Sequence, residues 1–309
     1  MNEYVIETTQ LTKSYGSVAA LEHVNLHVKK GSIYGLIGDN GAGKSTMFKL
    51  LAGHALPTSG ELQLLGSHEG KDLNRARKHM GFMIEQPGFF PNMTVEKTLE
   101  YYRIQKGVPD RKKAEEMLYL TRIDHKRKSK CKTLSLGQKQ RLGLAIAMIG
   151  EPAVLILDEP INGLDPSGII EFRNLLHRLN EEKNVTLLLS SHILTELEQL
   201  ATTYGFLDNG RLIEEIPAKD LMEKCSDCIE IKVSDAAKYA ALLEKSFPEE
   251  SYTVLPDSAI RITKPKKELE IYGRLASENA ISIIGMGRLQ SSLEDYYMNL
   301  KSANGGKTA

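Results

Sequence analysis

The spacing of apolar and polar residues predicts two kinds of strand. Residues 3–37 alternate, as in Val24-Asn25-Leu26-His27-Val28, which predicts an antiparallel sheet with one buried face. The run at 154–157 is apolar throughout, and most of 185–189 and of 33–37 is apolar. Such runs are typical of strands that are covered on both faces of a parallel sheet. Because helices and strands alternate from 134 to 224, the pattern predicts an α/β fold with a parallel core.

A restart of the pattern after residue 224 predicts a second domain. We therefore divide the chain into domains 1–224 and 225–309, with two or three helices at 94–130 in the first. The second has the order β-α-β-β-α-β, which predicts a small α+β domain. Its expected elements are strand 229–233, helix 236–247, hairpin 252–262, helix 266–279, strand 281–286 and helix 292–300. The polar, Gly-containing stretch 301–307 predicts a disordered tail.

A phosphate-binding loop follows the strand predicted at 33–37. Its residues fit the pattern G-x-x-x-x-G-K-[ST] and precede an apolar helical run: Gly38, Asp39, Asn40, Gly41, Ala42, Gly43, Lys44, Ser45 and Thr46. Glycines let the backbone wrap around a phosphate chain, and the helix N-terminus adds positive potential. Lys44 is expected to reach the outer phosphates and Ser45 to hold Mg²⁺. The sequence thus predicts a nucleoside triphosphate site.

Two carboxylates end the apolar strand at 154–157. Asp158 and Glu159 come at its carboxyl end, where open α/β sheets bind ligands. We expect Asp158 to bind Mg²⁺ through a water, and Glu159 to polarise an attacking water as a general base. Such a pair is a weak signal alone and a strong one beside a phosphate loop.

The segment Leu134-Ser135-Leu136-Gly137-Gln138 carries the resemblance to a family. It resembles the L-S-G-G-Q signature of the ATP-binding subunit of an ABC transporter, with Leu136 in place of glycine. The resemblance implies a P-loop ATPase core with an antiparallel β subdomain and a helical subdomain. It also implies that Ser135, Leu136, Gly137 and Gln138, at a helix start, contact the ATP held by a second copy.

Further landmarks follow in the order that the resemblance implies. Asp165, in Asn162-Gly163-Leu164-Asp165, matches the D-loop that crosses the dimer interface. His192 closes the apolar strand 187–191 and matches the switch histidine that contacts the γ-phosphate. Tyr15 matches the aromatic residue that stacks on adenine.

One landmark departs from the family pattern. At the Q-loop the position of the common glutamine holds Glu85, and Gln86 comes one residue later. Either side chain could approach Mg²⁺ and the attacking water, so both remain candidates. The shift and Leu136 together resemble subunits of bacitracin-, lantibiotic- and drug-export transporters.

Composition is consistent with an ATPase that works through a separate membrane protein. The 309 residues hold 40 basic and 40 acidic side chains, so the net charge of zero does not point to nucleic acid. The apolar runs are far shorter than the roughly 18 residues that span a bilayer, and the start of the chain lacks a basic n-region. Cys225 and Cys228 form a lone C-x-x-C without the further ligands of a zinc site.

The resemblance implies a homodimer that binds ATP and Mg²⁺ and drives an integral-membrane permease. We expect it in the cytoplasm, on the inner face of the membrane, and without a nucleic-acid partner. A second hypothesis is a soluble ABC ATPase acting on ribosomes or DNA, which usually has paired cassettes or a long coiled coil. A third is a binding protein without turnover, which the presence of Glu159 and His192 disfavours.

Overall fold

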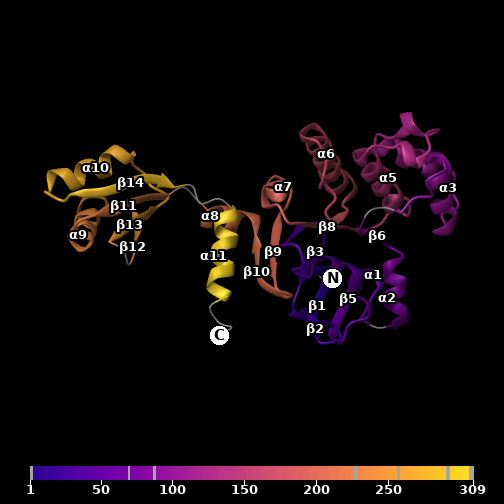
Figure 1. The fold of residues 1–309 in the computed structure, drawn as a ribbon, viewed down its shortest axis with the longest axis horizontal. Helices are drawn as coiled ribbons and strands as arrows, with labels where there is room; N and C mark the ends of the chain where they lie inside the picture. Colours follow the sequence, from indigo (N-terminus) through magenta and orange to yellow (C-terminus); the bar gives the residue numbers. More distant parts are fainter. Residues whose placement is uncertain are drawn as a thin grey trace. The chain divides into compact units, whose positions relative to one another are not determined.

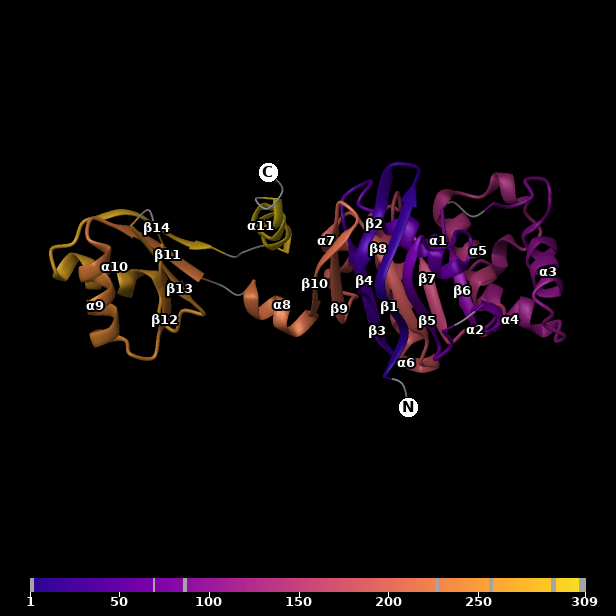
Figure 2. The ribbon, with the colours of Figure 1, turned by 90° about the horizontal axis from the view of Figure 1, so that it is seen from below.

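The computed structural model describes residues 3–68, 70–85, 88–225, 228–255, 258–289 and 293–305. The chain divides into two compact units, residues 1–218 and 219–309, drawn in Figures 1 and 2. Each unit has its own core, and each is described by itself.

The first unit contains an antiparallel sheet. Its strands are β1 (Tyr4–Tyr15), β2 (Val18–Val24), β3 (His27–Lys29) and β5 (Ser59–Leu64). They follow the order β2-β1-β3, and β5 also pairs with β1. The predicted antiparallel sheet is confirmed for these strands. The inclusion of residues 33–37 in it was wrong, because β4 (Ile33–Ile37) is buried along its whole length and pairs with parallel strands instead.

The second sheet of this unit has the order β10-β9-β4-β8-β7-β6. Its strands are β6 (Met80–Met83), β7 (Val154–Leu157), β8 (Thr186–Ser191), β9 (Thr203–Asp208) and β10 (Arg211–Pro217), together with β4. All neighbours are parallel except β10, which runs antiparallel to β9. Every residue of β4, β7 and β8 is buried, as the apolar runs predicted. The carboxyl ends of these three strands therefore lie along one edge.

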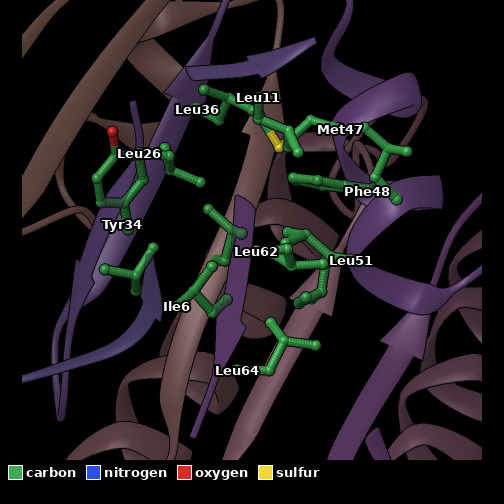
Figure 3. Packing of buried hydrophobic residues seen from close by; sticks show 14 of the residues in the cluster. Ile6, Leu11, Leu26, Tyr34, Leu36, Met47, Phe48, Leu51, Leu62 and Leu64 are labelled. Atoms are coloured by element: carbon green, nitrogen blue, oxygen red, sulfur yellow. The ribbon is translucent and has the colours of Figure 1, made fainter. Parts of the chain in front are cut away.

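An apolar core joins the two sheets to α1 (Lys44–Ala52) and α2 (Gly70–Arg77). Figure 3 shows Phe48 and Leu51 of α1 turned toward Leu62 of β5, with Ile6 of β1 beside them. Because the helix that follows the phosphate loop is packed into this core, its N-terminus has a fixed direction.

Helices make up the rest of the first unit. Helices α3 (Val95–Gln105), α4 (Lys112–Leu120) and α5 (Leu136–Met148) pack against one another, with short 3₁₀ turns at Asp124–Lys126 and Cys131–Thr133. The other helices are α6 (Pro166–Lys183) and α7 (Leu194–Glu198), and α8 (Ala218–Lys224) begins where the two units divide.

The second unit has the β-α-β-β-α-β order that the sequence predicts. Its elements are β11 (Cys228–Val233), α9 (Ala236–Ser246), β12 (Ser251–Val254), β13 (Ala259–Thr263), α10 (Leu269–Glu278) and β14 (Ile283–Leu289). The strands form one antiparallel sheet in the order β12-β13-β11-β14. A separate apolar core lies between this sheet and residues of α9 and α10.

The last helix is longer than predicted. Helix α11 (Leu293–Gly305) continues through the segment that we expected to be a disordered tail. The Ser302 hydroxyl donates to the carbonyl oxygen of Met298 at 2.9 Å, and Nζ of Lys301 lies 5.4 Å from the ring centroid of Tyr297. Both contacts join neighbouring turns of this helix, and residues 306 and 307 lie outside the described residues.

Candidate active site

The loop of residues 38–43 joins β4 to α1 in a shape that requires glycine. Gly43 has φ +112°, and a Cβ there would come 2.6 Å from the carbonyl oxygen of Ala20. A Cβ at Gly38 would come 2.5 Å from the carbonyl oxygen of Leu207. A larger residue at either position would therefore displace neighbouring backbone, so the loop keeps its close turn only with glycine.

The first turn of α1 is arranged to meet an anion. Gly43 is the N-cap and brings no side-chain oxygen to the first N–H groups of the helix. Lys44 is buried, and its Nζ donates to the carbonyl oxygens of Gly38 at 2.6 Å and Asp39 at 3.1 Å. Ser45, next on the same turn, is exposed. Backbone N–H groups, an ammonium and a hydroxyl therefore gather at one helix N-terminus, a setting that favours phosphate.

Asp158 and Glu159 lie directly after β7. The Asp158 N–H donates to the carbonyl oxygen of Met83 on β6 at 2.8 Å, which fixes the end of the strand. Glu159 then takes a left-handed backbone conformation, with φ +44°. Its Oε2 accepts a hydrogen bond from Nδ2 of Asn162 at 2.9 Å. The carboxylate is therefore held from the turn that leads into α6.

Two cationic or ionisable side chains approach the other oxygen of Glu159. Nδ1 of His192, just after β8, lies 3.1 Å from Oε1 of Glu159. Nζ of Lys44 lies 3.6 Å from the same oxygen. Three landmarks that are far apart in the sequence thus converge on one carboxylate oxygen.

An open cleft of about 470 Å³ collects part of the predicted site. Its walls combine residues of the phosphate loop, Q-loop, carboxylate pair, signature and D-loop: Ser45, Glu85, Leu136, Gln140, Asp158, Glu159, Asn162 and Gly163. The lining drawn from the described residues does not include Lys44, His192, Thr46 or the loop residues 38–43. It also does not include Tyr15, Ser135, Gly137, Gln138 or Asp165, which the resemblance assigns to adenine or to a second copy.

The oxygen donors of this cleft fit a magnesium ion that arrives with a nucleotide. Ser45, Glu85 and Asp158 supply a hydroxyl and two carboxylates to the same space. Among the described residues, no group of three or more His, Cys, Asp or Glu could hold a metal by itself. Mg²⁺ is commonly bound by one or two carboxylates plus substrate phosphates, so this incomplete set suits it.

Glu85 lies on the Q-loop in a left-handed conformation, with φ +63°. Its Oε1 forms an ion pair with Nζ of Lys49 on α1 at 2.7 Å. Lys49 lowers the pKa of the Glu85 carboxyl below its ordinary value. Gln86 lies outside the described residues, so the choice between the two Q-loop candidates stays a prediction.

The signature segment begins α5. The Ser135 hydroxyl accepts from the N–H of Gln138 at 3.3 Å, and Oε1 of Gln138 accepts from the N–H of Ser135 at 3.1 Å. This capping box starts the helix at Leu136, as expected for a signature at a helix start. Leu136 faces the D-loop, since a Cβ on Gly163 would come 2.7 Å from its Cδ2.

Two other predicted residues lie at exposed positions. Tyr15 ends β1 with 51% of its surface exposed, and Nζ of Lys13 lies 4.8 Å from its ring centroid. Asp165 is the N-cap residue of α6, and the Ser167 hydroxyl that it accepts from lowers the pKa of its carboxyl.

Sequence reasoning missed Ser190 and Lys49. Ser190 is a fully buried hydroxyl on β8, and Lys49 pairs with Glu85 from α1. The signal for Ser190 was a polar residue within an apolar strand, close to the position expected for catalytic carboxylates. Lys49 had no comparable signal, because its role depends on a contact between segments far apart in the sequence.

Comparisons with known proteins agree with this geometry. Residues 21–162 match the family model described as ABC transporter. The chain is 39% identical to the bacitracin transport ATP-binding protein BcrA of Bacillus licheniformis, over 96% of this chain and 97% of that protein. It is also 39% identical to the lantibiotic transport ATP-binding protein SrtF of Streptococcus pyogenes, over 68% of this chain and 90% of the relative.

A solved structure of similar fold is a dimeric ATP-binding cassette in a post-hydrolysis state, bound to ADP and Pi. It shares 27% identity and a TM-score of 0.63, over 69% of this chain and 98% of that one. None of the helices in the described parts of the chain combines the length and apolarity needed to cross a membrane. The chain therefore belongs to the ABC transporter family, as an ATP-binding subunit that hydrolyses ATP.

Proposed function

We propose that the cleft between α1 and the carboxyl ends of β7 and β8 is the site where this subunit hydrolyses ATP. The observation that carries the proposal is the convergence of Lys44 and His192 on the Oε1 of Glu159. These residues belong to the phosphate loop, the switch strand and the carboxylate pair. Groups that must act on one phosphate and one water therefore lie within reach of one another.

Each residue of the site has a specific role in this proposal. Glu159 accepts a proton from the attacking water, and His192 contacts the γ-phosphate. Lys44 leaves the carbonyl oxygens of its own loop and donates to the outer phosphates. Tyr15 stacks on adenine, and its exposed ring is free to do so on a face that Lys13 does not occupy.

Mg²⁺ fits the oxygen donors of the cleft. Ser45 and Asp158 would hold it, and Glu85 or Gln86 would approach it from the Q-loop. When bound, the ion neutralises charge on the β- and γ-phosphates. The residues of the chain orient the nucleotide, and Glu159 supplies the general base.

Two copies of the chain would together complete two ATP-binding sites. In this arrangement residues 38–46 of one copy and 135–138 of the other enclose each ATP, and Asp165 lies near the interface. The dimeric state of the similar cassette supports the arrangement. Size-exclusion chromatography of Glu159→Gln tests it, because ATP should convert this variant to a dimer and ADP should not. A monomer with saturating ATP would exclude the arrangement.

The proposed partner is an integral-membrane permease, with this subunit on the inner face of the cell membrane. The proposed cargo is a peptide antibiotic or drug, which the transporter exports or against which it gives immunity. One relative is a bacitracin transport protein and another is a lantibiotic transport protein, which supports a peptide antibiotic. No nucleic-acid partner is proposed.

A susceptibility assay tests the cargo. A bacitracin-sensitive host would express the chain together with a candidate membrane permease. The wild-type pair should raise the inhibitory concentration of bacitracin, and a pair carrying Glu159→Gln should not. Equal inhibitory concentrations for both pairs, with active ATPase in the first, would exclude bacitracin as the cargo.

A further inference from the structure

Ser190 is a buried hydroxyl that contacts both members of the carboxylate pair. It lies on β8, where its side chain is 0% exposed. Its Oγ lies 2.8 Å from the backbone nitrogen of Glu159 and 2.6 Å from Oδ1 of Asp158. Its neighbours on the strand are leucines before it and Ser191 after it, and the Ser191 hydroxyl turns instead toward Ile193 and Glu196.

The two hydrogen bonds of Ser190 have a fixed direction. The N–H of Glu159 can only donate, so Oγ of Ser190 must accept there. The Ser190 proton is then directed at the Asp158 carboxylate, which accepts it. Because no solvent reaches the hydroxyl, loss of either bond would leave a buried polar group without its partner, which is unfavourable.

The position of Glu159 depends on such a restraint. Its φ of +44° is a conformation that residues other than glycine rarely adopt, because it is energetically unfavourable. The bond from its N–H to Ser190 holds this turn from β8. The same hydroxyl donates to one oxygen of Asp158, so a single side chain restrains the backbone at Glu159 and the carboxylate of Asp158.

We propose that Ser190 is a positioning residue for ATP hydrolysis. It orients Asp158 toward the metal and Glu159 toward the attacking water, and it ties both to β8, which leads to His192 two residues later. This inference rests on the roles proposed above for Asp158 and Glu159. Ser190 itself is buried behind the carboxylates and acts through them.

The test compares Ser190→Ala with Ser190→Thr, which keeps the hydroxyl. Loss of a residue that orients a catalytic ligand typically costs 10- to 100-fold in activity or metal affinity. We expect Ser190→Ala to lower kcat by about 10-fold or more, and to raise the Mg²⁺ concentration at half-maximal rate. The KM for ATP should change much less, because Lys44 and the phosphate loop are untouched. Ser190→Thr should recover most of kcat.

A measurement without nucleotide separates positioning from activity. Hydrogen exchange of the Glu159 amide should accelerate in Ser190→Ala and return toward the wild-type rate in Ser190→Thr. Thr186→Val is the matched control, because it removes another buried β8 hydroxyl, one that accepts from the N–H of Gly31 at 2.9 Å. The control should lower Tm without changing kcat or the Mg²⁺ requirement. If Ser190→Ala does not fold, Ser190→Cys carries the same measurements.

The outcomes separate this inference from the proposed function. If Glu159→Gln is inactive while Ser190→Ala keeps wild-type kcat, Mg²⁺ dependence and amide exchange, the role of Ser190 is overturned. The role is also overturned if Thr186→Val reproduces the kinetic changes of Ser190→Ala. A Glu159→Gln variant that hydrolyses ATP at the wild-type rate would instead overturn the proposed base.

Discussion

Nδ1 of His192 lies 3.1 Å from Oε1 of Glu159, so the switch histidine and the proposed base are in direct contact. The contact joins the end of β8 to the turn after β7. Side chains that contact one another in this way act as a unit, and their mutational effects do not add.

His192→Ala should therefore lower kcat by about 100-fold while leaving ATP binding nearly intact, since loss of one positioned catalytic group has effects of that size. The double variant His192→Ala/Glu159→Gln should be no slower than the slower single variant. Steady-state ATPase assays of the three variants check both expectations. Additive losses in the double variant would show that the two side chains act independently.

The Q-loop prediction concerns Glu85 and Gln86. Glu85→Gln should still support hydrolysis, because it restores the residue that is common at this position of the family. If Gln86 is the functional residue, Gln86→Ala should lower the ATPase rate much more than Glu85→Ala. If both alanine variants have negligible effects on the ATPase rate, neither Glu85 nor Gln86 has the proposed Q-loop role.

Lys49→Met removes the ion pair between Lys49 and Glu85 and tests whether this pair stabilises the fold. The pair is exposed, and exposed pairs contribute little to stability. We expect Tm to stay close to the wild-type value in this variant. A large loss of Tm would show that the pair has a structural role beyond the Q-loop.

A buried network around Tyr34 should limit stability. Its hydroxyl donates to Oε1 of Glu215 at 2.7 Å, and burial beside this carboxylate raises the pKa of Tyr34. The Tyr34 hydroxyl lies beside Gly205, and a Cβ added at Gly205 would come 2.1 Å from the Tyr34 hydroxyl oxygen. Tyr34→Phe should cost about 1–2 kcal/mol, and Gly205→Ala should cost more because it overpacks a closed site.

Thermal or urea unfolding of these variants measures both costs. In the double variant Tyr34→Phe/Gly205→Ala, the phenyl ring lacks the oxygen that a Cβ meets first, so part of the loss should be relieved. A Gly205→Ala variant as stable as the wild type would contradict the packing described here.

The stability of the chain should depend on Lys106 at alkaline pH. Its Nζ donates to the carbonyl oxygens of Ile146 and Ala147 at the end of α5. The residue as a whole is exposed, but desolvation of its ammonium by the surrounding protein lowers its pKa to about 8, from 10.5. Between pH 8 and 10.5 the unfolded chain therefore binds a proton that the folded chain does not. By linkage, this group makes stability rise with pH across that window and adds no slope below it.

Urea unfolding at several pH values checks the sign. The free energy of unfolding of the wild type minus that of Lys106→Met should increase from pH 8 to 10.5. The subtraction cancels the titration of other groups. A difference that falls over this window would show that the folded chain favours the charged form of Lys106.

Much of the fold followed from periodicity, because continuous apolar runs mark strands that are buried on both faces. That argument identified β7 and β8 and the position of Asp158, Glu159 and His192 after them. The argument from alternation misplaced residues 33–37, because it extended the antiparallel sheet over a run that is mostly apolar and belongs to the parallel sheet. Only the pairing of β4 with β8 and β9 separates the two sheets.

The candidate site was less predictable wherever a contact decides the role of a residue. The motif patterns located the phosphate loop, the carboxylates and the switch histidine, but the roles of Ser190 and Lys49 depend on contacts with segments far away in the sequence. The prediction of a disordered tail was wrong for residues 301–305, because it rested on polar composition alone. Composition does not show the contacts that Lys301 and Ser302 make with the preceding turn of α11.

The most direct test of the account is the ATPase rate of Glu159→Gln, measured alongside its affinity for a fluorescent ATP analogue. Exchange of the carboxylate for an amide keeps the shape of the side chain and removes the base. The account predicts wild-type affinity with hydrolysis reduced about 100-fold or more. Wild-type affinity with a wild-type rate of hydrolysis would contradict it.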